Sequence, residues 1–309
     1  MVTITKHEVV VSTVIAVIIS GVFLVLEQHF EKQDDLSKPT SENLVSLLQE
    51  EKVHEFNKLK QKRFDPIVLR NIDLSELNLS GVDLSFTNFV DSDFTETNFT
   101  NANLNGVEFT GITTVSQGIF YNATLNDANF ENIGFYNANL TGAELYDTDL
   151  TGAYLGRADL FNAYLGYSDL TGAYLEDINL SHAYLQNTDL TGAYLGRADL
   201  SHAYLPNSDL TGADLLNADL TRARLEDANL TNAYLNNADL TGADLWRAIL
   251  TNADLSNSDL TGADIRHANL AGTIFAANSD STYYVVKNSP IPREEALHRG
   301  AIWPENPEE

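Results

Sequence analysis

TGAYLGRADLFNAYLGYSDL at residues 151–170 returns almost unchanged as TGAYLGRADLSHAYLPNSDL at residues 191–210. The two segments differ at four positions of twenty, whereas the two ten-residue halves of the first differ at four of ten. Every fifth residue is Leu from Leu140 to Leu270, with Ile265 as the one substitution. A period of five fits neither an ordinary helix nor a flat strand, so the pattern predicts a solenoid with twenty residues, or four units, per coil.

The residue two positions before each Leu predicts how the solenoid is packed inside. It is usually Ala, with Thr148, Ser168 and Ile178 among the exceptions, and the other three positions are polar, aromatic or Gly. One large and one small apolar side chain per unit fill a narrow core to the density of a protein interior. We therefore expect Leu and Ala to face inward and Gly to lie at corners, where the backbone turns tightly.

ANLTG, ADLTG and AYLGR resemble the A(D/N)LXX consensus of the pentapeptide-repeat family. The resemblance implies an all-β solenoid, a right-handed quadrilateral parallel β-helix whose coils stack about 4.8 Å apart. Units in phase with the repeat run from Leu74 to Phe109 and from Phe120 to Phe275. They predict a β-helix at residues 69–275, with about ten coils and a length of about 50 Å.

The rhythm changes once, because Phe109 and Phe120 are eleven residues apart. Residues 110–119 are therefore an irregularity, either a one-residue bulge at a corner or a hinge or projecting loop used for recognition. Phe is favoured at inward positions around this segment, namely Phe89, Phe94, Phe99, Phe109, Phe130 and Phe135.

The N-terminus predicts a membrane anchor. After a tail at residues 1–8, residues 9–26 contain no charge over eighteen positions, which is near the lower limit for a transmembrane helix. A cleavable signal peptide is the alternative, although no small-x-small site follows the apolar stretch. Lys6 precedes the span and mostly acidic residues follow it, so the positive-inside tendency places the N-terminus in the cytoplasm. The repeat then lies outside it, in the periplasm, or in the thylakoid lumen if the host is photosynthetic.

Both ends of the solenoid are predicted to be capped. A linker at residues 27–40 leads to a helical segment at residues 41–65, with Ser41 as expected N-cap and Asp65-Pro66 as its end. We interpret it as the N-terminal cap, because an open solenoid exposes apolar core and unpaired strand edges. A short coiled coil that forms a homodimer is the alternative. Residues 276–309 are interpreted as a C-terminal cap and tail, with STYYVVKN as a strand and PREEALHRGAIW as a helix.

Positions twenty apart are expected to stack in columns on the surface. Two opposite faces then carry columns of carboxylates, and the two faces between them carry columns of Tyr. The rings either stack on one another or form a strip that binds a partner. The candidate partner-binding surface is Tyr154, Tyr164, Tyr174, Tyr184, Tyr194 and Tyr204.

No arrangement of residues argues for catalysis, and we predict no catalytic, cofactor-binding or metal-binding residue. His182 and His202 stack in neighbouring coils and invite comparison with a metal pair, but the repeat itself imposes their spacing. The carboxylates lie in solvated lines and are not paired with a base or nucleophile in a pocket. The chain has no Cys and no Gly-rich phosphate loop between a strand and a helix.

Charge excludes direct nucleic-acid binding, because 44 acidic and 18 basic residues give a formal net charge of −26. The leading hypothesis is a non-enzymatic, membrane-anchored scaffold that presents its acidic surface to a protein or cell-envelope partner, with residues 9–26 in the membrane. The alternative is a cytoplasmic DNA mimic that inhibits a type II topoisomerase. That reading follows from the resemblance, since some pentapeptide-repeat proteins occupy DNA gyrase in this way, but those mimics lack a membrane span.

Overall fold

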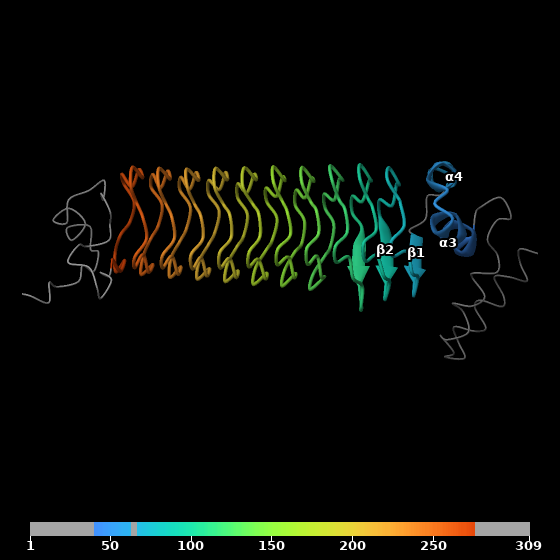
Figure 1. The fold of residues 1–309 in the computed structure, drawn as a ribbon, viewed down its shortest axis with the longest axis horizontal. Helices are drawn as coiled ribbons and strands as arrows, with labels where there is room; N and C mark the ends of the chain where they lie inside the picture. Colours follow the sequence, from blue (N-terminus) through green and yellow to red (C-terminus); the bar gives the residue numbers. More distant parts are fainter. Residues whose placement is uncertain (1–39, 63–66, 276–309) are drawn as a thin grey trace, which may run out of the picture.

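The computed structural model describes residues 40–62 and 67–275, and residues 67–275 form a rod of stacked coils (Figure 1). Parallel bridges join residues twenty apart along most of the rod, for example Asp149 to Asp169 and Asp169 to Asp189. The predicted right-handed quadrilateral β-helix with twenty residues per coil is therefore confirmed. One face of the first coils carries three parallel strands in the order β1-β2-β3: β1 (Ile67–Arg70), β2 (Thr87–Val90) and β3 (Glu108–Thr110).

The backbone N–H groups explain why the period is five. Three of the five in a unit bind carbonyls of neighbouring coils, one closes the corner, and one binds the side chain of the Asp or Asn before Leu. A unit with Asp or Asn before Leu thus pairs all five backbone donors, and the same pattern can be repeated indefinitely. Around Leu150 the bonds are Leu150 N–H to Asp169 O (2.7 Å), Gly152 N–H to Thr171 O (3.0 Å), Tyr154 N–H to Ile133 O (2.9 Å), Ala153 N–H to Leu150 O (3.0 Å) and Thr151 N–H to Asp149 Oδ1 (3.0 Å).

Each corner is a β-turn whose third residue has a positive φ, the signature of a type II turn. Gly152 takes this position with φ 63°, as expected. The expectation of Gly was incomplete, however, because Arg157 (φ 59°), Tyr167 (φ 65°) and many Asn residues occupy the same position at other corners. The hydrogen-bond ladder on both sides holds these residues in a backbone conformation that costs a non-Gly residue roughly 1 kcal/mol.

The inward positions form one continuous hydrophobic core. Leu150, Leu155 and Ala153 have no exposed surface, and the same holds for nearly every equivalent Leu and Ala. At several positions a hydroxyl replaces Ala and binds a backbone carbonyl: Thr148 Oγ1 donates to Leu125 O of the preceding coil at 2.9 Å, Ser168 Oγ donates to Leu145 O, and Ser208 Oγ donates to Leu205 O of its own coil at 2.7 Å. Burial of these three hydroxyls is compensated by hydrogen bonds, whereas the buried Thr87 Oγ1 has no hydrogen-bond partner among the described residues.

Phenylalanine rings fill the core around the irregular segment. Phe89 and Phe94 pack edge to face at 4.8 Å, and Phe94 stacks on Phe109 at 5.1 Å. Phe120 continues the cluster, and a Cβ at Gly118 would lie 2.8 Å from its ring. Here a glycine takes the place of Ala and provides the space that the larger ring needs.

The eleven-residue interval contains one six-residue unit. The bridges change from twenty to twenty-one residues at Asp93–Thr114 and return to twenty at Thr114–Gly134. Val115 takes the inward position with no exposed surface, and Ile112 projects outward with 90% of its surface exposed. The extra residue is thus accommodated at one corner, and every later coil keeps its register.

Residues 40–62 form two helices, α3 (Ser41–Gln49) and α4 (Val53–Lys60), where we predicted a single helix. The chain reverses at Glu51, which has a φ of 53°. The N-cap is Thr40 and not Ser41, because the Thr40 hydroxyl accepts the Asn43 N–H at 3.2 Å. Figure 1 shows both helices at the end where the chain enters the rod.

The helices contact the first coil in two ways. Leu44, Leu48 and Phe56 are fully buried and belong to the same core as the rod. Polar side chains of residues 40–62 also bind backbone N–H and C=O groups of the first coil, which in the rest of the rod bind the preceding coil. Glu51 Oε1 accepts the Asn78 N–H (2.8 Å), Asn57 Oδ1 accepts the Asp83 N–H (2.8 Å), Asn57 Nδ2 donates to Gly81 O (2.9 Å), and Lys60 Nζ donates to Ser85 O (2.6 Å).

Several predicted segments lie outside the described residues: the tail at 1–8, the anchor at 9–26, nearly all of the linker at 27–40, and the C-terminal cap at 276–309. Within residues 40–62 and 67–275, no helix combines the length and the hydropathy needed to cross a membrane.

Candidate interaction surface

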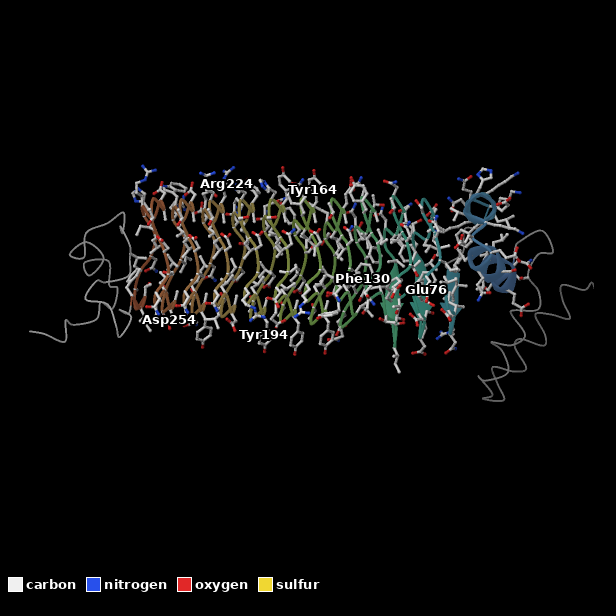
Figure 2. All side chains as sticks on the ribbon, in the orientation of Figure 1. Glu76, Phe130, Tyr164, Tyr194, Arg224 and Asp254 are labelled. Atoms are coloured by element: carbon white, nitrogen blue, oxygen red, sulfur yellow. The ribbon has the colours of Figure 1, made fainter. Side chains whose placement is uncertain are left out.

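Four columns of side chains run along the rod at the position before each inward Leu, one column on each face. Figure 2 shows Tyr164 and Tyr194 on opposite edges, with Phe130 between them. The bridged members are Tyr154, Tyr174 and Tyr194 (first tyrosine column); Tyr164, Tyr184 and Tyr204 (second tyrosine column); Asp149, Asp169, Asp189 and Asp209 (first aspartate column); and Asp159, Asn179, Asp199, Asp219, Asp239 and Asp259 (second aspartate column).

The first tyrosine column is a regular stack. The rings of Tyr154 and Tyr174 lie 4.8 Å apart at an angle of 5°, and those of Tyr174 and Tyr194 lie 5.0 Å apart at 7°. The three side chains remain 38–49% exposed. Since the rings face one another along the rod, their edges and hydroxyl groups face the solvent.

The second tyrosine column also begins with two stacked rings, but its last ring contacts an arginine side chain. Tyr164 stacks on Tyr184 at 4.9 Å, whereas Tyr204 is tilted by 54° and lies 6.2 Å from Tyr184. The Arg224 guanidinium lies over the Tyr204 ring at 4.7 Å from its centroid, a cation–π contact. Sequence reasoning missed this contact, although Arg224 lies twenty residues after Tyr204 and alignment at that period places the two together.

Further aromatic contacts at the corners were also missed. Tyr146 packs against Tyr167 at 5.1 Å, and these residues are twenty-one apart, so strict alignment at twenty separates them. Burial raises the pKa of Tyr146, and Tyr167 and Asp147 add to this effect. At another corner, the Arg157 guanidinium lies 5.9 Å from the ring centroid of Tyr136.

The aspartates hold the corners and are less free than expected. In the first aspartate column each carboxylate accepts the N–H two residues further on through Oδ1, at 2.9 to 3.0 Å. This Asx-type contact explains the preference for Asp or Asn before Leu. It uses one oxygen, and the Oδ2 atoms of these four residues form no hydrogen bond within the described ranges.

Ion pairs link some of the corners. Arg197 binds Asp177 through two hydrogen bonds, Nε to Oδ1 at 2.7 Å and Nη2 to Oδ2 at 2.9 Å, and Arg157 Nε lies 3.8 Å from Asp177 Oδ2. The hydrogen bond from Arg197 holds the pKa of Asp177 below its ordinary value, against the opposing effect of burial. Because these side chains are exposed, the pair contributes little to stability.

The geometry of the histidine pair does not suit one metal ion. The rings of His182 and His202 are stacked 4.8 Å apart at an angle of 4°. A zinc ion lies about 2.1 Å from each ligand nitrogen, close to the plane of each ring. Two parallel planes at this separation cannot both contain the ion. In residues 40–62 and 67–275, no group of three His, Cys, Asp or Glu is arranged to hold a metal.

Comparison with known proteins identifies the repeat. The family model for pentapeptide repeats matches in eight copies at residues 69–113, 119–157, 158–197, 193–232 and 238–275. No curated protein matches the sequence.

Solved structures with the same repeat include three that differ in origin. HetL, a protein involved in heterocyst differentiation regulation in the cyanobacterium Nostoc sp. strain PCC 7120, is 34% identical (69% of this chain, 90% of HetL, TM-score 0.45). A thylakoid-lumen protein of Arabidopsis thaliana is 26% identical (40% of this chain, 75% of that protein, TM-score 0.30). QnrB1, a plasmid-mediated fluoroquinolone resistance protein, is 18% identical (70% of this chain, 92% of QnrB1, TM-score 0.32).

Proposed function

Since the chain belongs to the pentapeptide-repeat family, we propose that it is a non-enzymatic, membrane-anchored scaffold whose tyrosine columns bind a protein or cell-envelope partner. One observation carries this proposal. Two opposite faces hold regular stacks of tyrosines that are exposed by about two fifths or more at Tyr154, Tyr164, Tyr184 and Tyr194. Exposed aromatic surface of this extent is uncommon without a use, and tyrosine is enriched where proteins meet.

The stacks also reduce the entropic cost of binding. A free tyrosine side chain loses rotamer freedom when a partner fixes it, whereas a ring held between two neighbours has already lost most of that freedom. Tyr174, which lies between Tyr154 and Tyr194 at 4.8 and 5.0 Å, is the clearest case. The outward hydroxyl groups then supply donors and acceptors for a partner.

The uncharged residues 9–26 support the membrane anchor in this proposal. The flanking charges support a cytoplasmic N-terminus and an extracytoplasmic rod. A reporter fused after Glu309 tests the orientation. Activity of a periplasm-dependent reporter is the expected result, and activity confined to a cytoplasmic reporter rejects the orientation.

The binding surface is tested by changing Tyr174, Tyr184 and Tyr194 to Ser in the full chain. These side chains point outward, so we expect an unchanged melting temperature within a few degrees and at least a tenfold loss of affinity for a partner captured by crosslinking in native membranes. Replacing the same residues by Phe keeps the ring stacks and separates the role of the hydroxyl groups. Undiminished capture by the Ser variant rejects the tyrosine columns as the binding surface.

The aspartate columns favour one other function, a DNA mimic that inhibits a type II topoisomerase in the cytoplasm. Carboxylates repeat at about the coil spacing of 4.8 Å on two opposite faces of the rod. A supercoiling assay with DNA gyrase tests this function directly. The full chain at micromolar concentration should inhibit the enzyme if it is a mimic, and undisturbed supercoiling rejects that function.

A further inference from the structure

Two opposite corners of the rod differ in charge and in shape. One corner carries His182, His202 and Arg222 at the positive-φ position of three successive coils, and we name these residues the basic column. All three side chains are exposed. The imidazoles are stacked 4.8 Å apart, and Arg222 forms no ion pair within the described residues, unlike the five arginines Arg157, Arg197, Arg224, Arg247 and Arg266.

The corner on the other side of the rod has no side chain at the same position. Gly172, Gly192 and Gly212 occupy it, and an added Cβ at each would meet no atom within 4 Å. The column beside these glycines is acidic, and the Oδ2 atoms of its carboxylates accept no hydrogen bond in the described part of the chain. We name this surface the glycine shelf: Gly172, Gly192 and Gly212 with Asp169, Asp189 and Asp209.

From this geometry we propose that the basic column of one chain docks on the glycine shelf of a second copy of the same chain. Each surface has three members, and the members of both repeat at the coil spacing of about 4.8 Å. The match in spacing is automatic between two copies, since both have the same rise per coil. The basic side chains fill the open space over the glycines and meet the carboxylate Oδ2 atoms, which accept no hydrogen bond from residues 40–62 or 67–275.

The position of the two surfaces decides the form of the assembly. His182 lies ten residues from Gly172 and from Gly192, which is half a coil, so the two surfaces face opposite directions and differ in height by about 2.4 Å. A sideways shift of one rod, with that small change in height, brings them together without rotation. A contact of this kind is heterologous and does not close on itself, so it produces rows of parallel rods.

Few contacts are available, and the charge of −26 on each chain opposes association, so pairing in dilute solution is weak. Anchoring all copies in one membrane gives them a common orientation and a high effective concentration. That last step rests on the proposed membrane anchor, whereas the contact itself does not.

Cysteine crosslinking tests the contact, and the natural chain contains no cysteine. Thr191 precedes Gly192 on the shelf, and Ser201 precedes His202 in the basic column. We expect the full chain with Thr191→Cys and Ser201→Cys together to form a ladder of dimers, trimers and larger species with a short bifunctional maleimide. Each single variant should remain monomeric, and an equal mixture of the two should stop at dimers. Dimers from one single variant alone indicate a twofold contact and overturn the proposal, as does the lack of a ladder.

A second set of variants removes the contact and keeps the fold. Asn occupies the equivalent corner position at Asn232 and Asn252 with φ 59° and 57°, so Gly172→Asn, Gly192→Asn and Gly212→Asn are compatible with the backbone. Added to the double-cysteine chain, they should reduce the ladder at least tenfold without changing the circular dichroism spectrum. Arg157→Asn with Arg197→Asn is the matched control at another corner, and it should leave the ladder unchanged. An undiminished ladder with the shelf filled overturns the proposal.

The crosslinking is carried out on vesicle-bound chain and on chain in detergent micelles, with vesicle binding scored separately by flotation. A ladder without vesicle binding rejects the anchor and keeps the contact. Vesicle binding without a ladder rejects the contact and keeps the anchor.

Discussion

At the scale of single residues, the side chain before each Leu decides whether a corner is fully hydrogen-bonded. Asp199 accepts the Ser201 N–H at 2.9 Å, and Asn229 accepts the Thr231 N–H at 3.2 Å, so the acid and the amide serve equally. Tyr154 and Tyr174 occupy the same position without such an acceptor. At these corners an exposed ring is present and the local hydrogen bond is absent. In the tyrosine columns, therefore, the residue before Leu is not the one that would stabilise the fold most.

Asp199 offers a direct measurement of this hydrogen bond. We expect Asp199→Ala to lower the free energy of unfolding by about 1 kcal/mol, because a charged acceptor is lost from a partly buried donor. Asp199→Asn keeps the acceptor and removes repulsion from Asp219 in the next coil, so its stability should equal or exceed that of the natural chain. Urea denaturation followed by circular dichroism gives both values. Equal losses for Ala and Asn contradict the assigned role.

At the scale of elements, α3 and α4 act at the strand edge through a few polar side chains. Lys60 Nζ donates to Ser85 O at 2.6 Å and lies 3.1 Å from Asp83 Oδ1. Burial lowers the pKa of Lys60 more than the pairing raises it. For Asp83, burial raises the pKa, but the hydrogen bond from Ser85 and the charge of Lys60 lower it further, so the net shift is downward.

Replacing Lys60 by Met should therefore destabilise the chain in a pH-dependent manner. At pH 7 we expect a loss of about 1 to 3 kcal/mol, because hydrogen bonds from a charged donor disappear. The lowered pKa of Asp83 contributes stability that is fully present above the ordinary carboxyl pKa of about 3.9 and is lost as the pH falls through the lower folded value. The difference between variant and natural chain should therefore shrink below about pH 4. Urea denaturation at pH 7, 5 and 3 measures it, and a constant difference contradicts the coupling.

The six-residue unit makes a prediction about deletions. Removing Ile112 leaves Phe109-Thr-Gly-Thr-Thr-Val, a regular unit with Val in the inward position, and removes a side chain that is 90% exposed. We expect this deletion to preserve the fold and the melting temperature within about 3 °C, which corresponds to roughly 1 kcal/mol. Deletion of Thr171 from a regular unit is the control, and it should destabilise the chain more, because the four residues that remain cannot form the corner and still place both Ala173 and Leu175 inward.

The elements also show where the sequence was sufficient. The Leu period and the Ala two residues earlier predicted the coil length and the core, because the same residue types recur at the same depth in every coil. The break at Glu51 was not visible, because Glu takes the positive-φ position, where Gly is usual, in the cap that ends α3 through the bonds Glu51 N–H to Leu48 O and Lys52 N–H to Leu47 O. The tyrosine stacks followed from alignment at twenty. The Arg224 contact with Tyr204 was not predicted, because the residue that continues the column in the next coil is a cation and not another tyrosine.

At the scale of the whole molecule, one narrow core connects all coils, so damage to one coil should spread to its neighbours. Leu195→Asp places a charge where the natural side chain has no exposed surface. We expect a loss of several kcal/mol and local unfolding around residues 175–215. Hydrogen exchange should show lost protection there and retained protection near the capped first coils. An unchanged melting temperature contradicts the inward placement of Leu195.

The α3–α4 cap also has a consequence for how the chain is assembled during synthesis. Most inter-coil contacts join residues about twenty apart, so each new coil requires closure of the same short loop. The cap is synthesised before the first coil. Each completed coil is then already hydrogen-bonded on its N-terminal side, and the next twenty residues can fold onto its other side. The chain is thus suited to growth from its N-terminus, one coil at a time, with a single advancing edge exposed to misfolding however long the repeat becomes.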